Sequence, residues 1–166
     1  MSNFDESKVN RQRDGKFGFK TAGAPAASLD NDLSSMDIRD RRAMAEHGTD
    51  EQRQVLMNDE NEWVRYTVAL YGTEEQRQTL MNDKDGLVRS GVAENGTDEQ
   101  REALINDDNI NVLLAIAEHG NDEQRQALID NDDWMVRATV AKFGTPEQRQ
   151  ALMHDENEHV RTSAQQ

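Results

Sequence analysis

The 166-residue chain contains no cysteine, and this absence removes several classes of site at once. Without thiols there is no disulfide, zinc–thiolate centre, cysteine-ligated iron–sulfur cluster or thiol nucleophile. No apolar run approaches the roughly 20 residues that a membrane-spanning helix needs. The N-terminal residues also lack the basic-then-apolar layout of a secretory signal. We therefore expect a soluble protein of the cytoplasm that binds no cofactor.

Positive charge is scarce outside the N-terminal segment. The chain has a net charge of −14. Residues 1–28 hold five basic and three acidic side chains, a net of +2, which leaves −16 for residues 29–166. A surface of that sign repels phosphate backbones. We expect residues 29–166 to avoid nucleic acid and membranes, and to attract a protein partner that is basic or itself binds nucleic acid.

A six-residue motif, Gly-Thr-x-Glu-Gln-Arg, returns every 24 residues without insertion or deletion. A short fixed period of this kind is typical of a stacked repeat array, in which each unit buries its apolar face against its neighbours. In the fourth copy Asn121 replaces the threonine. The five copies begin at Gly48, Gly72, Gly96, Gly120 and Gly144.

The motif itself predicts the start of a helix. Thr49 is a favoured N-cap residue, and Gln52 stands three positions later, where a capping box requires it. The first helix then runs for about two turns, to Leu56. Leucine returns at this position in every copy, at Leu80, Leu104, Leu128 and Leu152.

A polar turn ends the first helix and predicts a second one. We expect Asp59 to cap the second helix, because Glu62 follows at the capping-box spacing. Val64 and Val68 then share one helix face. We expect Gly72 to end the helix in a left-handed conformation. The first of these valines recurs as Val88, Val112, Val136 and Val160.

Helices this short are marginal by themselves and need their neighbours. The sequence therefore predicts an all-α solenoid of about five and a half two-helix repeats over residues 29–166, preceded by a flexible basic tail at 1–28. Residues 29–47 form a degenerate half-repeat in which Asp40 replaces the core valine. A polar residue there suits an N-terminal cap.

The tract Asp59-x-x-x-x-Val64-Arg65-x-x-Val68-Ala69 resembles the HEAT-like repeats and, more closely in period, the leucine-rich repeat variant. This resemblance covers residues 29–166 and implies a right-handed superhelix whose first helices are α or 3-10. One member type carries a cysteine-ligated iron–sulfur domain, which this chain cannot have. HEAT-like arrays serve as protein scaffolds, nucleic-acid glycosylases and bilin lyases. The last two use basic grooves or catalytic residues that are not found here.

Residues 9–17, Val-Asn-Arg-x-x-Asp-Gly-Lys-Phe, resemble a leader found on small proteins of actinobacterial phages and mobile elements. This resemblance implies an accessory or anti-defence role.

An arginine follows the core valine in most copies and predicts an ionic ladder. We expect each to bond an aspartate at the preceding turn, such as Asp59 or Asp83, and so to link the copies. In the third copy Leu113 takes the arginine position. Either the ladder is interrupted there or the array makes an apolar contact. The arginines concerned are Arg65, Arg89, Arg137 and Arg161.

The recurring Glu51-Gln52-Arg53 triplet has two interpretations. It could form a binding ridge, or a solvated helix face whose charges pair with one another. We favour the solvated face, with part of the recurrence due to packing of Gln52 one turn before Leu56.

Large aromatic residues are few, and they are candidates for a binding surface. Trp63 and Tyr66 lie on the second helix of the first copy, off the positions of the core valines. They either anchor a partner or cover gaps between copies. We include Trp134, Leu113 and Leu114 in this candidate surface.

No catalytic constellation stands out, so we expect no enzymatic activity. The four histidines do not predict a metal site. His47 and His119 lie three copies apart, and His154 and His159 flank one turn without an obvious third ligand.

The N-terminal tail combines cations with aromatic rings. Nucleic acid, an acidic partner or the chain's own acidic repeats could be its target, or it could have none. The tail candidates are Arg11, Arg13, Lys16, Phe17 and Phe19.

These observations predict a non-enzymatic module that binds a protein partner. The alternative is a DNA mimic, whose carboxylates would stand in for phosphates inside a restriction nuclease or a CRISPR effector. The carboxylates proposed for either mode are Asp107, Asp108, Asp130, Asp132 and Asp133.

Overall fold

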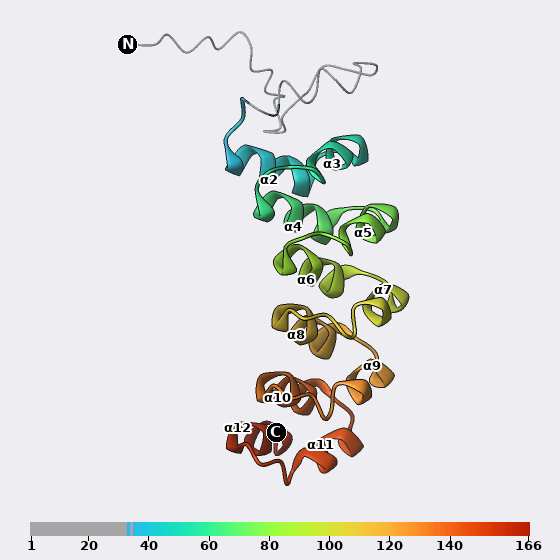
Figure 1. Cartoon of the computed structure of the whole chain (residues 1–166), viewed down its shortest axis with the longest axis vertical. Coiled ribbons are helices and arrows are strands. Elements are labelled where there is room, and N and C mark those ends of the chain that lie inside the picture. Colours follow the sequence, from blue (N-terminus) through green and yellow to red (C-terminus); the bar gives the residue numbers. More distant parts are fainter. Residues whose placement is uncertain (1–32, 34) are drawn as a thin grey trace, which may run out of the picture.

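The computed structural model describes residues 33 and 35–166, and within them every regular element is a helix. The helices alternate between two columns along the long axis (Figure 1). One column holds the second helix of each repeat: α2 (Ile38–His47), α4 (Glu62–Tyr71), α6 (Gly86–Asn95), α8 (Ile110–His119), α10 (Trp134–Phe143) and α12 (Glu158–Ala164). The other holds the first helices: α3 (Asp50–Leu56), α5 (Glu74–Leu80), α7 (Asp98–Ala103), α9 (Asp122–Ala127) and α11 (Pro146–Leu152).

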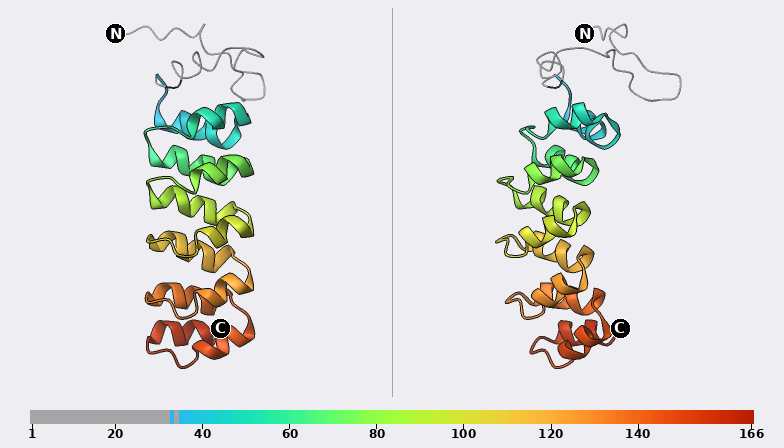
Figure 2. Two further views of the ribbon diagram at one scale, coloured as in Figure 1. Left: turned by 45° about the vertical axis from the view of Figure 1, so that its right-hand side comes forward. Right: turned by 90° about the vertical axis from the view of Figure 1, so that its right-hand side faces the viewer.

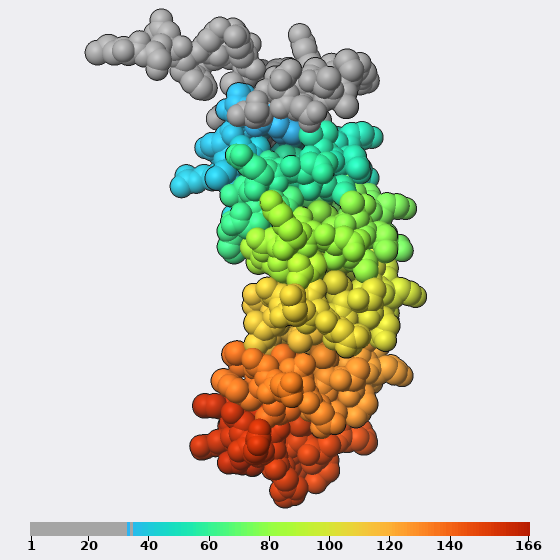
Figure 3. Space-filling view, viewed as in Figure 1, coloured from blue at the N-terminus to red at the C-terminus, as the bar shows by residue number. Residues whose placement is uncertain are grey.

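The two columns confirm the predicted all-α repeat architecture. Both side views show the helical pairs stacked one above another (Figure 2), and the space-filling view shows each repeat abutting the next (Figure 3). All five first helices are α-helical. None of the helices in the described part is long and apolar enough to cross a membrane. The tail candidates Arg11, Arg13, Lys16, Phe17 and Phe19, and the leader resemblance at 9–17, lie outside the described residues.

The core is a continuous seam of small and medium aliphatic side chains. Second helices of neighbouring repeats pack directly on one another, α4 on α6 and α6 on α8. Such close approach suits valine and alanine, and it stabilises helices that are too short to persist alone. All five core valines are fully buried, and the first-helix leucines are at most 5% exposed. In the leading half-repeat Asp40 is exposed where the others have valine.

The N-cap residues of the first helices are the predicted ones, whereas those of the second helices differ from the prediction. Thr49 and Gln52 form the predicted capping box. The cap of α4, however, is Asn61, which accepts a hydrogen bond from the Trp63 amide. Asp59 is engaged elsewhere: it accepts from the Asn61 amide and pairs with Arg41. The prediction of Asp59 as the cap was therefore wrong by two residues.

The reason for the repeated glycine also differs from the prediction. Gly72 has extended backbone angles, φ −74° and ψ 177°, rather than left-handed ones. A Cβ atom there would lie 2.6 Å from the Val68 carbonyl oxygen and 2.7 Å from Oε1 of Gln76. Glycine is needed because the next helix begins against the end of the previous one.

The recurring Gln-Arg pair is largely structural, so the face is not fully solvated as expected. The packing predicted for the glutamine is confirmed, because it is buried in every copy. The predicted pairing within the helix is also present, as Arg53–Asp50, Arg101–Asp98 and Arg125–Asp122. Gln124 is 2% exposed. Its Oε1 accepts from the Asn121 amide, and its Nε2 donates to the Asp98 carbonyl 26 residues earlier, at 2.7 Å. The arginine next to it caps the preceding helix in several copies, as when Arg53 donates to the carbonyls of Ala45 and Glu46. The glutamate of the triplet remains exposed in every copy.

Gln124→Ala should lower the free energy of unfolding by about 1–3 kcal/mol, because it removes two hydrogen bonds that a buried side chain makes. Gln126→Ala is the matched control: it is on the same helix, but its side chain is exposed. We expect that control to stay within about 0.5 kcal/mol of the original chain. Urea denaturation followed by circular dichroism compares the two. Equal losses would contradict the role assigned to the bridge.

Candidate functional site

A ladder of buried ion pairs links the repeats along the second helices. The Nε of Arg65 lies 2.7 Å from Oδ2 of Asp83, and the same pairing joins Arg89 to Asp107 at 2.6 Å. The ladder confirms the prediction of linked copies, but the carboxylate comes from the following turn, 18 residues later, rather than from the preceding one. The four pairs are Arg41–Asp59, Arg65–Asp83, Arg89–Asp107 and Arg137–Asp155.

The preceding turn contributes carbonyls instead of a carboxylate. Nη1 of Arg65 donates to the backbone oxygens of Asp59 and Glu60, so one guanidinium holds two successive turns. The hydrogen bond that Arg65 donates to Asp83 raises the pKa of Arg65 against the opposing effect of burial. The Arg137 guanidinium likewise lowers the pKa of Asp155 below its usual value.

This pKa shift predicts acid sensitivity. A carboxyl whose folded pKa is depressed stabilises the fold above its unfolded pKa, about 3.9, and that stability is lost as the pH falls through the folded value. We expect Asp155 to titrate below 3.9 in carbonyl-detected NMR, and Arg137→Gln to return it towards the ordinary value. Titration of Asp155 at or above that value in the original chain would contradict the assignment.

In the third copy both members of the ladder ion pair are replaced by uncharged residues. Leu113 replaces the arginine, and Asn131 stands 18 residues later where the other repeats have aspartate. No carboxylate is therefore left without its cation. Leu113 packs, partly buried, against the core. The ladder is therefore interrupted at this junction, which is one of the two alternatives that the sequence left open.

The outward side of the second helices is a surface that varies from copy to copy. We call it the second-helix face. It lies opposite the core valines by helical spacing. Two positions define it: one is occupied in turn by Trp63, Leu87, Asn111, Met135 and His159, the other by Tyr66, Ser90, Leu114, Ala138 and Thr162.

Two candidate aromatics meet at the first copy. Trp63, 45% exposed, lies edge-on to Tyr66 with ring centroids 6.0 Å apart, and the Arg42 guanidinium lies 5.8 Å from the tryptophan ring centroid. The Tyr66 hydroxyl donates to the Glu94 carboxylate of the next repeat at 3.0 Å. Burial and this bond raise the pKa of Tyr66 to about 12. These rings both cover a junction between repeats and remain accessible.

The remaining apolar candidates divide between two locations. Leu113 and Leu114 are both partly buried and pack against the core, and Leu114 also lines an open hollow on the second-helix face between α6 and α8. Trp134, 38% exposed, stacks on His159 of the following repeat with centroids 5.1 Å apart. The structure therefore does not bring all five candidates into one patch.

The five candidate aspartates have different roles. Asp107 is buried in the ladder, its side chain 7% exposed. Asp133 caps α10 by accepting from the Met135 amide. Asp108 is exposed and bonds Arg89 at 3.0 Å. Asp130 and Asp132 are exposed. Three of the five thus present carboxylates to solvent.

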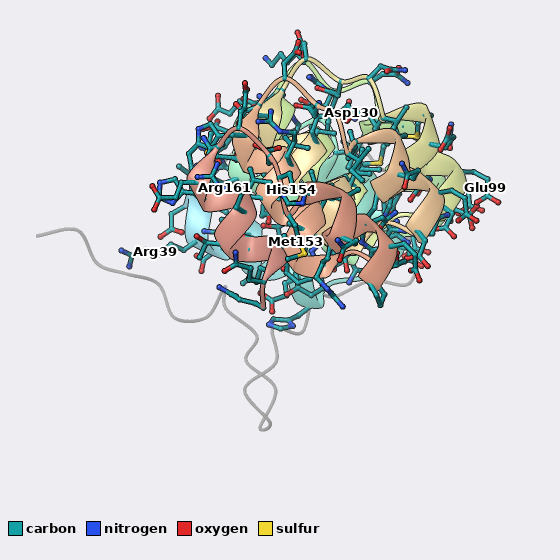
Figure 4. All side chains as sticks on the ribbon, turned by 90° about the horizontal axis from the view of Figure 1, so that it is seen from below. Arg39, Glu99, Asp130, Met153, His154 and Arg161 are labelled. Atoms are coloured by element: carbon teal, nitrogen blue, oxygen red, sulfur yellow. The ribbon has the colours of Figure 1, made fainter. Side chains whose placement is uncertain are left out.

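A second set of carboxylates follows the first helices. Glu99 lies at the rim of the molecule when it is viewed along its axis (Figure 4). Bonds from the capping threonine, and from its own amide, lower the pKa of Glu51. We call this set the first-helix edge; its exposed glutamates are Glu51, Glu75, Glu99, Glu123 and Glu147.

Nothing in the geometry of the described residues points to catalysis or a metal. No group of three or more histidine, aspartate or glutamate side chains among them is arranged to hold an ion. His47, His119, His154 and His159 are all exposed.

Sequence reasoning missed the hollow beside Leu114. It is lined by α6 and α8 through Leu87, Ser90, Glu94, Asn111, Leu114, Ala115, Glu118 and His119. Comparing each outward position from copy to copy would have shown the small residues that create it.

This architecture is similar to that of a known repeat protein. A solved structure described as a leucine-rich repeat variant with a novel repetitive protein structural motif matches 85% of this chain at 28% identity, with a TM-score of 0.69. The chain is a helical-repeat protein. It spans 60% of the length of that leucine-rich repeat variant, and the resemblance seen in the sequence is confirmed at the level of the helical-repeat fold. Such folds are generally binding scaffolds.

A second comparison points to another helical repeat. The model of the Pumilio-family RNA binding repeat matches residues 44–59, 94–107 and 116–131. Each match runs from the end of a second helix through the following first helix. No curated protein matches the chain. The phage-leader resemblance at 9–17 finds no support in these comparisons.

Proposed function

We propose that the second-helix face binds a protein partner of basic character and that the chain has no enzymatic activity. The observation that supports this is the contrast between its surfaces. The glutamine, arginine and aspartate positions repeat because they hold the stack together, whereas the outward positions of the second helices change from copy to copy. Specific recognition needs side chains that differ along the surface.

The energetics favour the same face. Exposed charge pairs contribute about 0–1 kcal/mol each, whereas truncating an aromatic side chain that is buried in an interface costs about 2 kcal/mol or more. Trp63, Tyr66 and Leu114 offer apolar area of that kind. The carboxylates around them would steer a basic partner and speed its association.

RNA binding is the second candidate, because the Pumilio-family repeat model matches three segments. Helical repeats of that family read about one base per repeat with two or three side chains. Against it stands the charge of −16 on residues 29–166. The matched segments also centre on α3, α7 and α9, whose Gln and Arg side chains serve the stack.

DNA mimicry is the third candidate, and two observations count against it. The ladder withdraws Asp107 from the surface, and Lys84 interrupts the row of exposed turn carboxylates. The first-helix edge supplies a second row, but mimicry would also require the spacing of duplex phosphates.

The test captures partners on the full chain and compares two variants. The face variant carries Trp63→Ala and Leu114→Ser. The edge variant carries glutamine in place of Glu75, Glu99 and Glu123. Helicity is checked in both. We expect the captured protein to bind the face variant at least about tenfold more weakly, and the edge variant nearly as well as the original chain.

Each rival outcome has its own signature. Stronger loss with the edge variant, together with a steep fall of affinity between low and high salt, would favour mimicry. A gel shift with a randomised RNA pool at physiological salt would favour the Pumilio-like role. A face variant that folds and binds like the original chain would sink the proposal.

A further inference from the structure

The hollow on the second-helix face has a simple origin in side-chain size. At the α4–α6 junction the Tyr66 ring lies over Gly91, where an added Cβ would meet the ring at 2.8 Å. One repeat later Ser90 takes the tyrosine position and Ala115 the glycine position. The ring has no counterpart there, so a recess opens between α6 and α8.

The hollow is lined by both apolar and polar side chains, and two of the polar ones are acidic. Asn111 and His119 are also part of the lining. Leu87 and Leu114 flank the small residues Ser90 and Ala115, both of which are buried. Glu94 and Glu118, which occupy the same position in successive helices, line it as well. The hollow therefore combines a place for hydrocarbon with a place for positive charge.

Neither glutamate is neutralised within the fold. Among the described residues, no cation lies within ion-pair distance of Glu94 or Glu118. Glu94 is nevertheless held in place, because the Tyr66 hydroxyl donates to both of its oxygens, at 3.0 and 3.2 Å. A fixed carboxylate loses less conformational entropy when it binds a cation.

We propose that this hollow receives a lysine or arginine side chain from an extended segment of the protein partner. Such side chains place an aliphatic stem against apolar surface and keep the charged end at the rim. The stem would lie over Ser90 and Ala115, and the cationic head between Glu94 and Glu118. This inference rests on the proposed function and names the chemistry that one part of the second-helix face recognises.

The experiment needs no partner. The full chain, labelled with ¹⁵N, is titrated with n-butylguanidinium, with guanidinium as the probe that lacks a stem and n-butanol as the probe that lacks a charge. We expect n-butylguanidinium to shift the amides of Leu87, Ser90, Leu114 and Ala115 with millimolar affinity. Each control probe should bind about tenfold more weakly, because it offers only half of the complementary chemistry.

Two variants locate the binding. Ser90→Leu fills the hollow with the residue that the next repeat carries at that position, and it should abolish the shifts. Thr162→Leu makes the same change at the equivalent position of α12 and should leave them intact. Glu94→Gln combined with Glu118→Gln should weaken binding about two- to fivefold or more.

Three results would overturn the inference. The first is that Ser90→Leu binds n-butylguanidinium as well as the original chain does. The second is that the amide shifts are spread evenly over all residues with exposed carboxylates. The third is that the amide resonances of residues 8–20 shift together with those of the hollow. The last would assign the hollow to the chain's own basic segment. Because no partner is present, failure here leaves the capture experiment and the proposed function to be judged separately.

Discussion

Replacing Asp83 by alanine should lower the free energy of unfolding by about 3–5 kcal/mol, because it leaves a buried guanidinium without its counter-charge. Asp83 accepts from Arg65 at 2.7 and 3.0 Å, and also from the Asp85 amide at 2.9 Å. The two side chains of the pair are only 6% and 8% exposed. Urea denaturation measures the loss, and hydrogen exchange should place the weakened protection at the junction of α4 and α6.

The control is Asp108→Ala, which also removes a carboxylate beside a ladder arginine. The Asp108 side chain is 95% exposed, so its removal should cost less than about 1 kcal/mol. A combined Arg65→Met and Asp83→Leu variant should recover much of the lost stability, because apolar side chains of similar size can replace a buried pair. Equal losses for Asp83→Ala and Asp108→Ala would contradict this account of the ladder.

Restoring the missing pair in the third copy should reveal strong coupling between two positions. Asn131→Asp alone places a carboxylate beside Leu113 and should destabilise the chain by about 3 kcal/mol. With Leu113→Arg present, that carboxylate gains its cation, and the guanidinium can reach the carbonyls of the preceding turn as its equivalents do. We expect a coupling energy of about 2–3 kcal/mol.

A double-mutant cycle from urea denaturation gives this coupling directly. The matched control cycle combines Leu113→Arg with Asn58→Asp, an exposed position two repeats away. That pair should be additive within about 0.5 kcal/mol. Additivity of Leu113→Arg with Asn131→Asp would show that the ladder geometry does not extend to this junction.

The interrupted junction has a parallel on the second-helix face. At Leu113 and Asn131 the array departs from its ionic pattern in both partners together. At Ser90 and Ala115 it departs from the Tyr66–Gly91 pattern in the same paired way. In both places two positions that meet between neighbouring repeats change together. One pair leaves the stack intact, and the other opens the hollow.

The local part of the structure could be predicted from the sequence. The capping box of Thr49 and Gln52 and the shared face of Val64 and Val68 involve positions three or four residues apart, whose separation is fixed by helix geometry. The Asp59 and Gly72 predictions failed for different reasons. Asp59 was assigned a role within its own repeat, but it pairs with Arg41 of the preceding repeat. Gly72 was assigned a left-handed backbone, but what requires glycine there is the close approach of Val68 and Gln76.

The candidate site could be predicted only in part. Exposure of Trp63 and Tyr66 follows from their offset from the core valines. The burial of Asp107 and the position of Leu114 beside the hollow depend on which turn of the neighbouring repeat each side chain meets. Sequence spacing alone leaves that choice open.

The sequence by itself determined the 24-residue period, the helix pairs and the apolar seam, because periodicity, capping and burial act within one repeat and its immediate copies. Only the tertiary structure decided that each arginine reaches the aspartate 18 residues later, that Gln124 bridges to a carbonyl 26 residues earlier, and that a hollow opens at Ser90. These contacts depend on how far one repeat is rotated and translated against the next, and that geometry arises when the repeats stack.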